Sequence, residues 1–186
     1  MSQSTQIVVG YDGSPDARAA LDWAIREAGS RHYGIRVVYC EPDLRAWDGV
    51  SATMAGAPVL ATALPQDGPT PGSEAAALVA AAGLPVETVS SPGSPAAILV
   101  EQSQSAVMVV IGSRGHGAVS SAILGSTVAH VASHAHCPVV VAQARGVPDG
   151  PVVVGVDGSA HSEELVGWAM DHASRHGLAL EVLHAY

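Results

Sequence analysis

Five short apolar runs alternate along the chain with longer stretches in which apolar and polar residues recur at helical spacing. Apolar runs bounded by glycine, proline or serine are typical of strands covered on both faces, as in a parallel sheet. The runs expected to form strands are 7–11, 35–40, 86–89, 107–111 and 137–142. Helices are expected from 15, over 74–82 and 95–102, and from 126 onward. This order predicts an α/β fold, a doubly wound five-stranded parallel sheet with helices on both faces, Rossmann-like in outline.

The fourth apolar run ends at Ile111 and leads into a glycine-rich turn, Gly112-Ser113-Arg114-Gly115. Nine residues then precede Gly125-Ser126-Thr127, where Ser126 is the expected N-cap of a helix. Glycines let backbone N–H groups approach an anion, and the free N–H groups of a helix N-terminus bind phosphate. Open α/β sheets bind ligands at this edge, so the two glycine segments predict a phosphate site. The alternative is that they are two unrelated tight turns. The helix is expected to pack on the sheet through Val128, Val131, Ala132 and Ala135.

The first apolar run, 7–11, is followed by the turn Asp12-Gly13-Ser14-Pro15. Ser14 as N-cap with Pro15 at the first helical position predicts a helix start. Asp12 has two interpretations: it only stabilises the turn, or it accepts hydrogen bonds from a ribose hydroxyl or an adenine amine at the edge that also carries Gly112. The inner face of the helix is expected to consist of Ala17, Leu21, Ala24 and Ala28.

The Asp-Gly-Ser turn and the spacing Gly112-x2-Gly115-x9-Gly125-Ser126 together resemble the ATP-binding signature of the universal stress protein family. The resemblance implies a fold like that of the adenine nucleotide alpha hydrolases and binding of ATP, possibly with Mg²⁺. It also implies a nucleoside contact at Asp12, a backbone contact to adenine near Cys40, and a homodimer through the last strand, Pro138 to Ala142. The nucleotide-binding residues predicted on this basis are Gly10, Tyr11, Asp12, Gly13, Ser14, Cys40, Ile111, Gly112, Ser113, Arg114, Gly115, His116, Gly125, Ser126 and Thr127.

Basic side chains are scarce, and the chain contains no lysine, which excludes P-loop chemistry and a lysine Schiff base. Arg114 is the only arginine between Arg45 and Arg145, and it either reaches phosphate oxygens or is a solvated loop residue. His116 is a candidate for contact with a terminal phosphate. Three further histidines are explained by the helix dipole, with a zinc site as the less favoured alternative: His130, His134 and His136.

Composition limits the partners. An apolar content of 48% supports a buried core, and the net charge of −9 argues against nucleic acid or an anionic membrane as partner. No apolar run approaches the length of a membrane span and the first residues lack a basic signal region, so a cytoplasmic protein is expected. Cys40 and Cys137 have neither metal-site spacing nor a disulfide-rich context, and both are expected to be reduced and buried beside strands.

Two segments interrupt the alternation of strands and helices. Residues 42–72 are rich in proline and glycine, which predicts a disordered insertion, with a lid over the ligand as the alternative. After a linker at 145–150, the sequence Val153 to Ser159 repeats Val8 to Ser14. Residues 1–144 are therefore expected to form one domain and 151–186 a partial second repeat of strand, helix and strand. The family's tandem members carry two complete domains, so the second repeat looks truncated, and it is expected to dock on another surface or to fray.

Three functions are compatible with these motifs. The favoured one is nucleotide binding in a stress response, with at most slow ATP hydrolysis, because no Walker-B carboxylate, magnesium pair or oriented base is evident. An adenylyl-transferring or ATP-pyrophosphatase-type enzyme is the second. Such enzymes have a serine–glycine loop or an H-x-G-H motif after the first strand, where this chain has Asp-Gly-Ser. The third is an interaction scaffold with an empty site.

Overall fold

The computed structural model describes residues 5–41, 68–115, 125–144 and 150–184. The chain divides into two compact units, Met1–Ala144 and Arg145–Tyr186. Each unit is described by itself. None of the helices in the described segments combines the length and the apolar character that crossing a bilayer requires.

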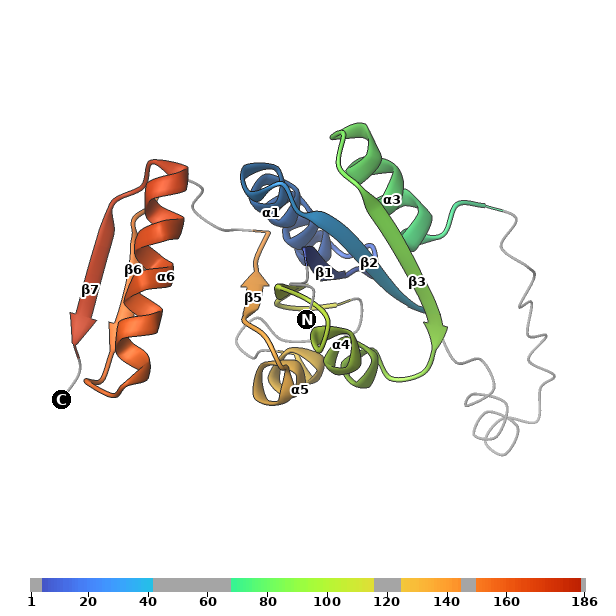
Figure 1. Cartoon of the computed structure of the whole chain (residues 1–186). Coiled ribbons are helices and arrows are strands. Elements are labelled where there is room, and N and C mark those ends of the chain that lie inside the picture. The colour runs from blue at the N-terminus through green and yellow to red at the C-terminus, as the bar shows by residue number, and fades with distance from the viewer. Residues whose placement is uncertain (1–4, 42–67, 116–124, 145–149, 185–186) are drawn as a thin grey trace, which may run out of the picture. The chain divides into compact units, whose positions relative to one another are not determined.

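The first unit contains a five-stranded sheet in which all neighbouring strands are parallel (Figure 1). The strand order is β3-β2-β1-β4-β5, so β1 is central and β5 lies at an edge. Its strands are β1 Gln6–Gly10, β2 Gly34–Glu41, β3 Val86–Pro92, β4 Met108–Gly112 and β5 Val139–Ala142. The predicted α/β architecture with a five-stranded parallel sheet is confirmed.

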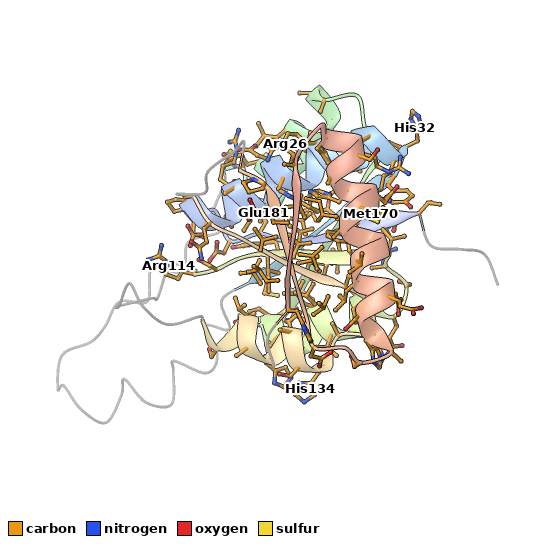
Figure 2. The ribbon with its side chains drawn as sticks, turned by 90° about the vertical axis from the view of Figure 1, so that its left-hand side faces the viewer. Arg26, His32, Arg114, His134, Met170 and Glu181 are labelled. Atoms are coloured by element: carbon orange, nitrogen blue, oxygen red, sulfur yellow. The ribbon has the colours of Figure 1, made fainter. Side chains whose placement is uncertain are left out.

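Helices cover both faces of this sheet: α1 Pro15–Arg31, α3 Pro71–Ala81, α4 Pro95–Ser103 and α5 Ser126–His134. Ile7 and Val9 point from β1 into the layer formed by α1 and α3, whereas Val8 between them points into the layer formed by α4 and α5. The side chains of both layers fill the space between sheet and helices in Figure 2. The continuous apolar runs of the sequence are thus explained by burial on both faces.

The predicted helices are all present, and the largest difference in their boundaries is at the start of α3. Ser14 caps α1 by accepting a hydrogen bond from the Ala17 amide at 3.2 Å, as expected. Helix α3 begins at Pro71, not at the predicted residue 74, because Thr70 accepts a hydrogen bond from the Ser73 amide and acts as the N-cap. Residues 71–72 therefore belong to this helix and not to the predicted insertion, whose residues 42–67 lie outside the described segments.

The inner faces of two helices were also predicted. In α1, all four positions predicted for the inner face are buried: Ala17, Leu21, Ala24 and Ala28. In α5, Val128 and Val131 are buried and Ala135 packs against the same core, but Ala132 is exposed. The prediction for Ala132 is wrong because α5 ends at His134 and only a narrow stripe of this short helix meets the sheet.

The order of the strands creates a crevice at one edge of the sheet. From β1 the chain proceeds to β2 and then β3 on one side, while β4 and β5 lie on the other side. The connections after β1 and β4 consequently leave the sheet toward opposite faces. Such a reversal opens a space at the carboxyl ends of the two strands, which is where open α/β sheets bind ligands.

The second unit consists of β6 Val152–Val156, α6 His161–His176 and β7 Leu180–His184, with the two strands parallel. The Asp157 Oδ1 atom accepts a hydrogen bond from the Ser159 amide at 2.9 Å, and Asp12 makes the same 2.9 Å contact with Ser14. Three strand side chains of this unit are more than half exposed: Val153, Val182 and Leu183. Their counterparts in the repeat are all buried: Val8, Val37 and Val38. The second unit therefore repeats the structure of the first as well as its sequence. Its described part has α6 packed on the strands but no counterparts of α3, α4 and α5.

Candidate functional site

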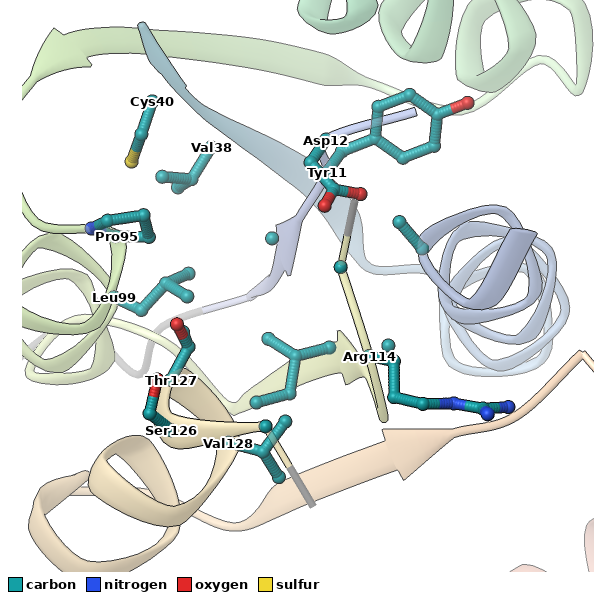
Figure 3. Close-up of a pocket in the computed structure, with 16 residues that line it drawn as sticks. Tyr11, Asp12, Val38, Cys40, Pro95, Leu99, Arg114, Ser126, Thr127 and Val128 are labelled. Carbon is teal, nitrogen blue, oxygen red and sulfur yellow. The ribbon is translucent and has the colours of Figure 1, made fainter. Parts of the chain in front are cut away.

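A pocket of about 420 Å³ occupies the crevice between the carboxyl ends of β1 and β4 (Figure 3). Residues from the β1 turn, the end of β2, α4, the β4 turn and the start of α5 line it. They are Gly10, Tyr11, Asp12, Ala17, Val38, Cys40, Pro95, Leu99, Ile111, Gly112, Arg114, Gly115, Gly125, Ser126, Thr127 and Val128. The two motifs singled out in the sequence, separated by about a hundred residues, thus line one cavity.

The turn after β1 places Asp12 in this pocket. Gly13 adopts φ 84°, a left-handed conformation that favours glycine, and this lets the Ser14 amide bend back to Asp12 Oδ1. The other carboxylate oxygen, Oδ2, would lie 2.5 Å from a Cβ atom on Gly115. Only a glycine at 115 allows the carboxylate and the second turn to approach so closely. Gly13 and Ser14 shape this turn and do not themselves line the cavity.

The turn after β4 is docked against the start of α1. A Cβ atom on Gly112 would lie 2.6 Å from the backbone carbon of Asp16 and from the backbone nitrogen of Ala17. The Ser113 amide donates to the Ala142 carbonyl at 2.8 Å, which extends the pairing of β4 with β5 into the turn. Ser113 is buried and does not line the pocket, so its contribution is to hold the turn.

Helix α5 begins at the pocket. The prediction of Ser126 as its N-cap is wrong: Gly125 is the N-cap and Ser126 is the first helical residue. The Gly125 amide donates to the Ser113 carbonyl at 3.2 Å, which draws the helix start toward the glycine turn. Side-chain capping of α5 is not observed among the described residues, and both Ser126 and Thr127 line the pocket in Figure 3. The positive end of the helix dipole and two hydroxyl groups therefore face the cavity.

One wall of the pocket is apolar. It consists of Val38, Cys40, Pro95, Leu99, Ile111 and Val128. Only Cys40 and Ile111 were predicted from the sequence. Burial raises the pKa of the Cys40 thiol, so this side chain is uncharged near neutral pH. Tyr11 contributes backbone, because its ring packs in the core between the sheet, α1 and α3.

Arg114 is bound to a carboxylate that sequence reasoning missed. The Arg114 Nε atom donates to Asp16 Oδ2 at 3.2 Å, and Figure 3 shows the guanidinium extending away from Ser126 and Thr127. Figure 2 shows Arg114 at the opposite end of the unit from His32, the C-cap residue of α1. The sequence suggested that Arg114 either reaches phosphate oxygens or is a solvated loop residue, and neither interpretation describes this ion pair. An acidic residue in the first turn of a predicted helix indicates an interaction with the helix dipole, but it does not indicate Arg114 as a partner.

Asp16 is an unusual carboxylate because it is only 5% exposed and yet ionised. Burial raises its pKa, but hydrogen bonds from Ser113, from the Ala144 amide and from Arg114 outweigh this effect and hold the pKa below its ordinary value. A lowered pKa in the folded state means that Asp16 stabilises the fold above its unfolded pKa of about 3.9. This contribution is lost as the pH falls through the lower pKa of the folded state.

The remaining histidine and cysteine predictions have different outcomes. His116 lies outside the described residues. The rings of His130 and His134 stack at 4.3 Å, and His134 Nδ1 lies 2.9 Å from the His130 carbonyl oxygen at the end of α5. This carbonyl contact agrees with the helix-end explanation. Both cysteines are free, but they are half-buried and not fully buried as expected.

Comparison with known proteins identifies the family. The family model described as "Universal stress protein family" matches residues 4–143 and 150–186. The chain belongs to the universal stress protein family. A universal stress protein of Mycolicibacterium smegmatis is 36% identical over 193 residues, which cover 97% of this chain and 63% of that protein. One from Mycobacterium tuberculosis is 34% identical and is matched over 62% of its length. This universal stress protein thus spans less than two thirds of the curated relatives it matches.

Solved structures share the fold. A universal stress protein from Archaeoglobus fulgidus superposes with a TM-score of 0.68 at 20% identity, covering 98% of this chain and 67% of that chain. A universal stress protein in complex with cAMP gives a TM-score of 0.54 at 23% identity, over 77% of this chain and 99% of that one. An Archaeoglobus fulgidus protein in complex with dAMP gives 0.52 at 21% identity, over 75% and 98%. At these identities the likeness demonstrates the common fold.

Proposed function

We propose that this universal stress protein binds ATP in the pocket between β1 and β4 and acts in a stress response through that binding. The observation that carries the proposal is the convergence of an acidic turn, a glycine turn and a helix N-terminus on one cavity. The acidic turn suits a ribose hydroxyl, and the glycine turn and the helix N-terminus both suit phosphates. A negative ligand without a base, such as free phosphate, would leave the apolar wall unused.

The chemistry of the walls suggests how ATP is oriented. The apolar wall around Val38 and Leu99 suits the adenine ring. Asp12 is an acceptor that lines the pocket, and its carboxylate suits a ribose hydroxyl. The backbone of the turn at Gly115 and the first residues of α5 after Gly125 offer N–H groups to the phosphates, since the Gly125 amide itself donates to the Ser113 carbonyl. Arg114 is engaged by Asp16, so backbone groups and hydroxyls are the proposed phosphate ligands.

The family members whose structures contain cAMP and dAMP support an adenine nucleotide as the ligand class. That the bound nucleotide is ATP, with or without Mg²⁺, is a further part of the proposal. Hydrolysis is proposed to be slow at most. Asp12 is the one carboxylate residue among those that line the described pocket, and its Oδ1 atom accepts the Ser14 amide. A dimer through the β5 edge and a cytoplasmic location stay predictions of the family resemblance.

Mass spectrometry of nucleotide released from the purified chain tests the function. We expect about one ATP per chain, because the proposal places ATP in one pocket of the chain. Release of pyrophosphate on addition of an acceptor would instead support the adenylyl-transferring enzyme. Protein that carries no nucleotide and gives no heat with added ATP in calorimetry would support the scaffold and refute the proposal. Repeating the titration with EDTA determines whether Mg²⁺ is required.

Removal of the second unit is expected to leave ATP binding intact. Every residue that lines the pocket belongs to the first unit, between Gly10 and Val128. A chain ending at Gly150 should therefore bind ATP within about twofold of the full chain, the scatter expected when no ligand contact is lost. Calorimetry on both proteins measures this, and circular dichroism serves as the control for folding. A large loss of affinity in a folded truncated chain would mean that residues 151–186 contribute to the site.

A further inference from the structure

Asp16 joins the start of α1 to two segments that are distant in sequence. Its Oδ2 atom accepts hydrogen bonds from the Ser113 hydroxyl at 2.6 Å and from Arg114 Nε at 3.2 Å. Its Oδ1 atom accepts the Ala144 amide at 3.0 Å. Ser113 and Arg114 belong to the glycine turn, and Ala144 follows the end of β5. One buried carboxylate therefore holds the ends of both β4 and β5 against the first turn of α1.

We propose that Asp16 is a positioning residue for the nucleotide, which it serves by fixing the glycine turn through Ser113 and Arg114. This inference rests on the proposed ATP binding. The two residues that Asp16 holds lie directly between Gly112 and Gly115, both of which line the pocket. Their side chains bond Asp16 and the Ser113 amide bonds the Ala142 carbonyl, so these contacts fix the course of the turn between two glycines that line the cavity. Besides these bonds, the Ser14 Oγ atom at the N-cap of α1 donates to the Arg114 carbonyl at 3.3 Å, a longer contact than that between Ser113 and Asp16.

The charge of Asp16 is essential to this arrangement. All three of its partners are donors, and a carboxylate is the side-chain group that accepts at both oxygens. An asparagine would present an amide NH₂ group to at least one of these donors. The position of Asp16 in the first turn of α1 also places its charge at the positive end of the helix dipole.

The second repeat shows that the Asp-Gly-Ser turn does not itself require Asp16. The repeat keeps this turn at 157–159, but His161 stands at the position equivalent to Asp16. Asp157 Oδ1 accepts the Ser159 amide at 2.9 Å, as Asp12 Oδ1 accepts the Ser14 amide. The turn therefore forms without an aspartate at the Asp16 position, which leaves the contacts to Ser113, Arg114 and Ala144 as the contribution of Asp16.

The test compares ATP affinity in the full chain and in three variants, at a temperature where circular dichroism shows all of them folded. Asp16→Asn is expected to weaken ATP binding about tenfold, and Ser113→Ala about threefold, because each frees the turn. The matched control is Asp22→Asn. Asp22 lies on the same helix and bonds Arg18, with 47% of its side chain exposed, so this variant should bind like the original chain. The ATP affinity of the unaltered chain is measured first, because it tests the proposed function separately from the proposed role of Asp16.

A double variant distinguishes positioning from a general loss of stability. If Asp16 acts on the nucleotide through Ser113, the double variant Asp16→Asn/Ser113→Ala should bind ATP no more weakly than Asp16→Asn alone. If the double variant lost ATP affinity by the product of the two single-variant factors, the two residues would act independently, and the proposed route through Ser113 would be wrong. Unchanged affinity in Asp16→Asn would overturn the proposal while leaving ATP binding standing. If Asp16→Asn does not fold, Ser113→Ala decides: wild-type affinity in that folded variant refutes the inference. A wild-type chain that does not bind ATP refutes both.

Discussion

Replacing Gly115 with valine is expected to weaken ATP binding about 100-fold, equivalent to about 2.7 kcal/mol, with little change in thermal stability. A Cβ atom at this position would lie 2.5 Å from Asp12 Oδ2. The obstructed atom is the end of a side chain, which can rotate away, so the fold survives. The rotation removes the proposed ribose acceptor, and the added methyl groups occupy the space proposed for the phosphates. Calorimetric titration with ATP, together with a thermal melt, measures both effects.

The matched control for this experiment is Gly29→Val. Gly29 lies on the exposed side of α1, and a Cβ atom there would meet nothing within 4 Å. This variant should bind ATP like the original chain, because valine is at least as favourable as glycine inside a helix. If Gly115→Val kept an affinity within a factor of about three, well below the expected loss, the pocket between β1 and β4 would not be the ATP site.

The fold was predictable because its signals are local. Continuous apolar runs mark the strands, and helix starts carry a serine followed by proline, as at Ser14 and Ser94. The same kind of signal stood at Thr70, where a threonine precedes Pro71, but the surrounding proline and glycine residues favoured a loop interpretation. Composition averaged over a long segment thus concealed a helix start that depends on two residues.

The candidate site was predictable only where a motif defines it. Asp12 and Gly115 follow strands in recognisable turns, and the structure brings them together. Leu99 reaches the pocket because α4 crosses the face on which β1 and β4 are neighbours, and this depends on strand order. Asp16 was missed for a related reason. Its partners Ser113 and Ala144 are 97 and 128 residues away in the sequence, and nothing local to Asp16 indicates them.

Replacing Gly112 with alanine is expected to destabilise the first unit by about 3 kcal/mol, the upper part of the range for overpacking a well-packed interior. A Cβ atom at Gly112 would lie 2.6 Å from the Asp16 carbon and the Ala17 nitrogen. These are backbone atoms, which move only if α1 is displaced from β4. Urea denaturation of the whole chain measures the loss, and hydrogen exchange assigns it to the amides of β4 and α1.

Gly112→Ala and Gly115→Val therefore separate folding from binding at two glycines of one turn. Each glycine avoids a contact of similar length, 2.6 Å at Gly112 and 2.5 Å at Gly115. Only the first of these contacts is with backbone. The control for stability is Gly29→Ala, which should raise the free energy of unfolding slightly, by up to about 1 kcal/mol. Wild-type stability in Gly112→Ala would mean that the β4 turn does not rest on the first turn of α1. The anchoring of the glycine turn, on which both the pocket and the proposed role of Asp16 depend, would then be wrong.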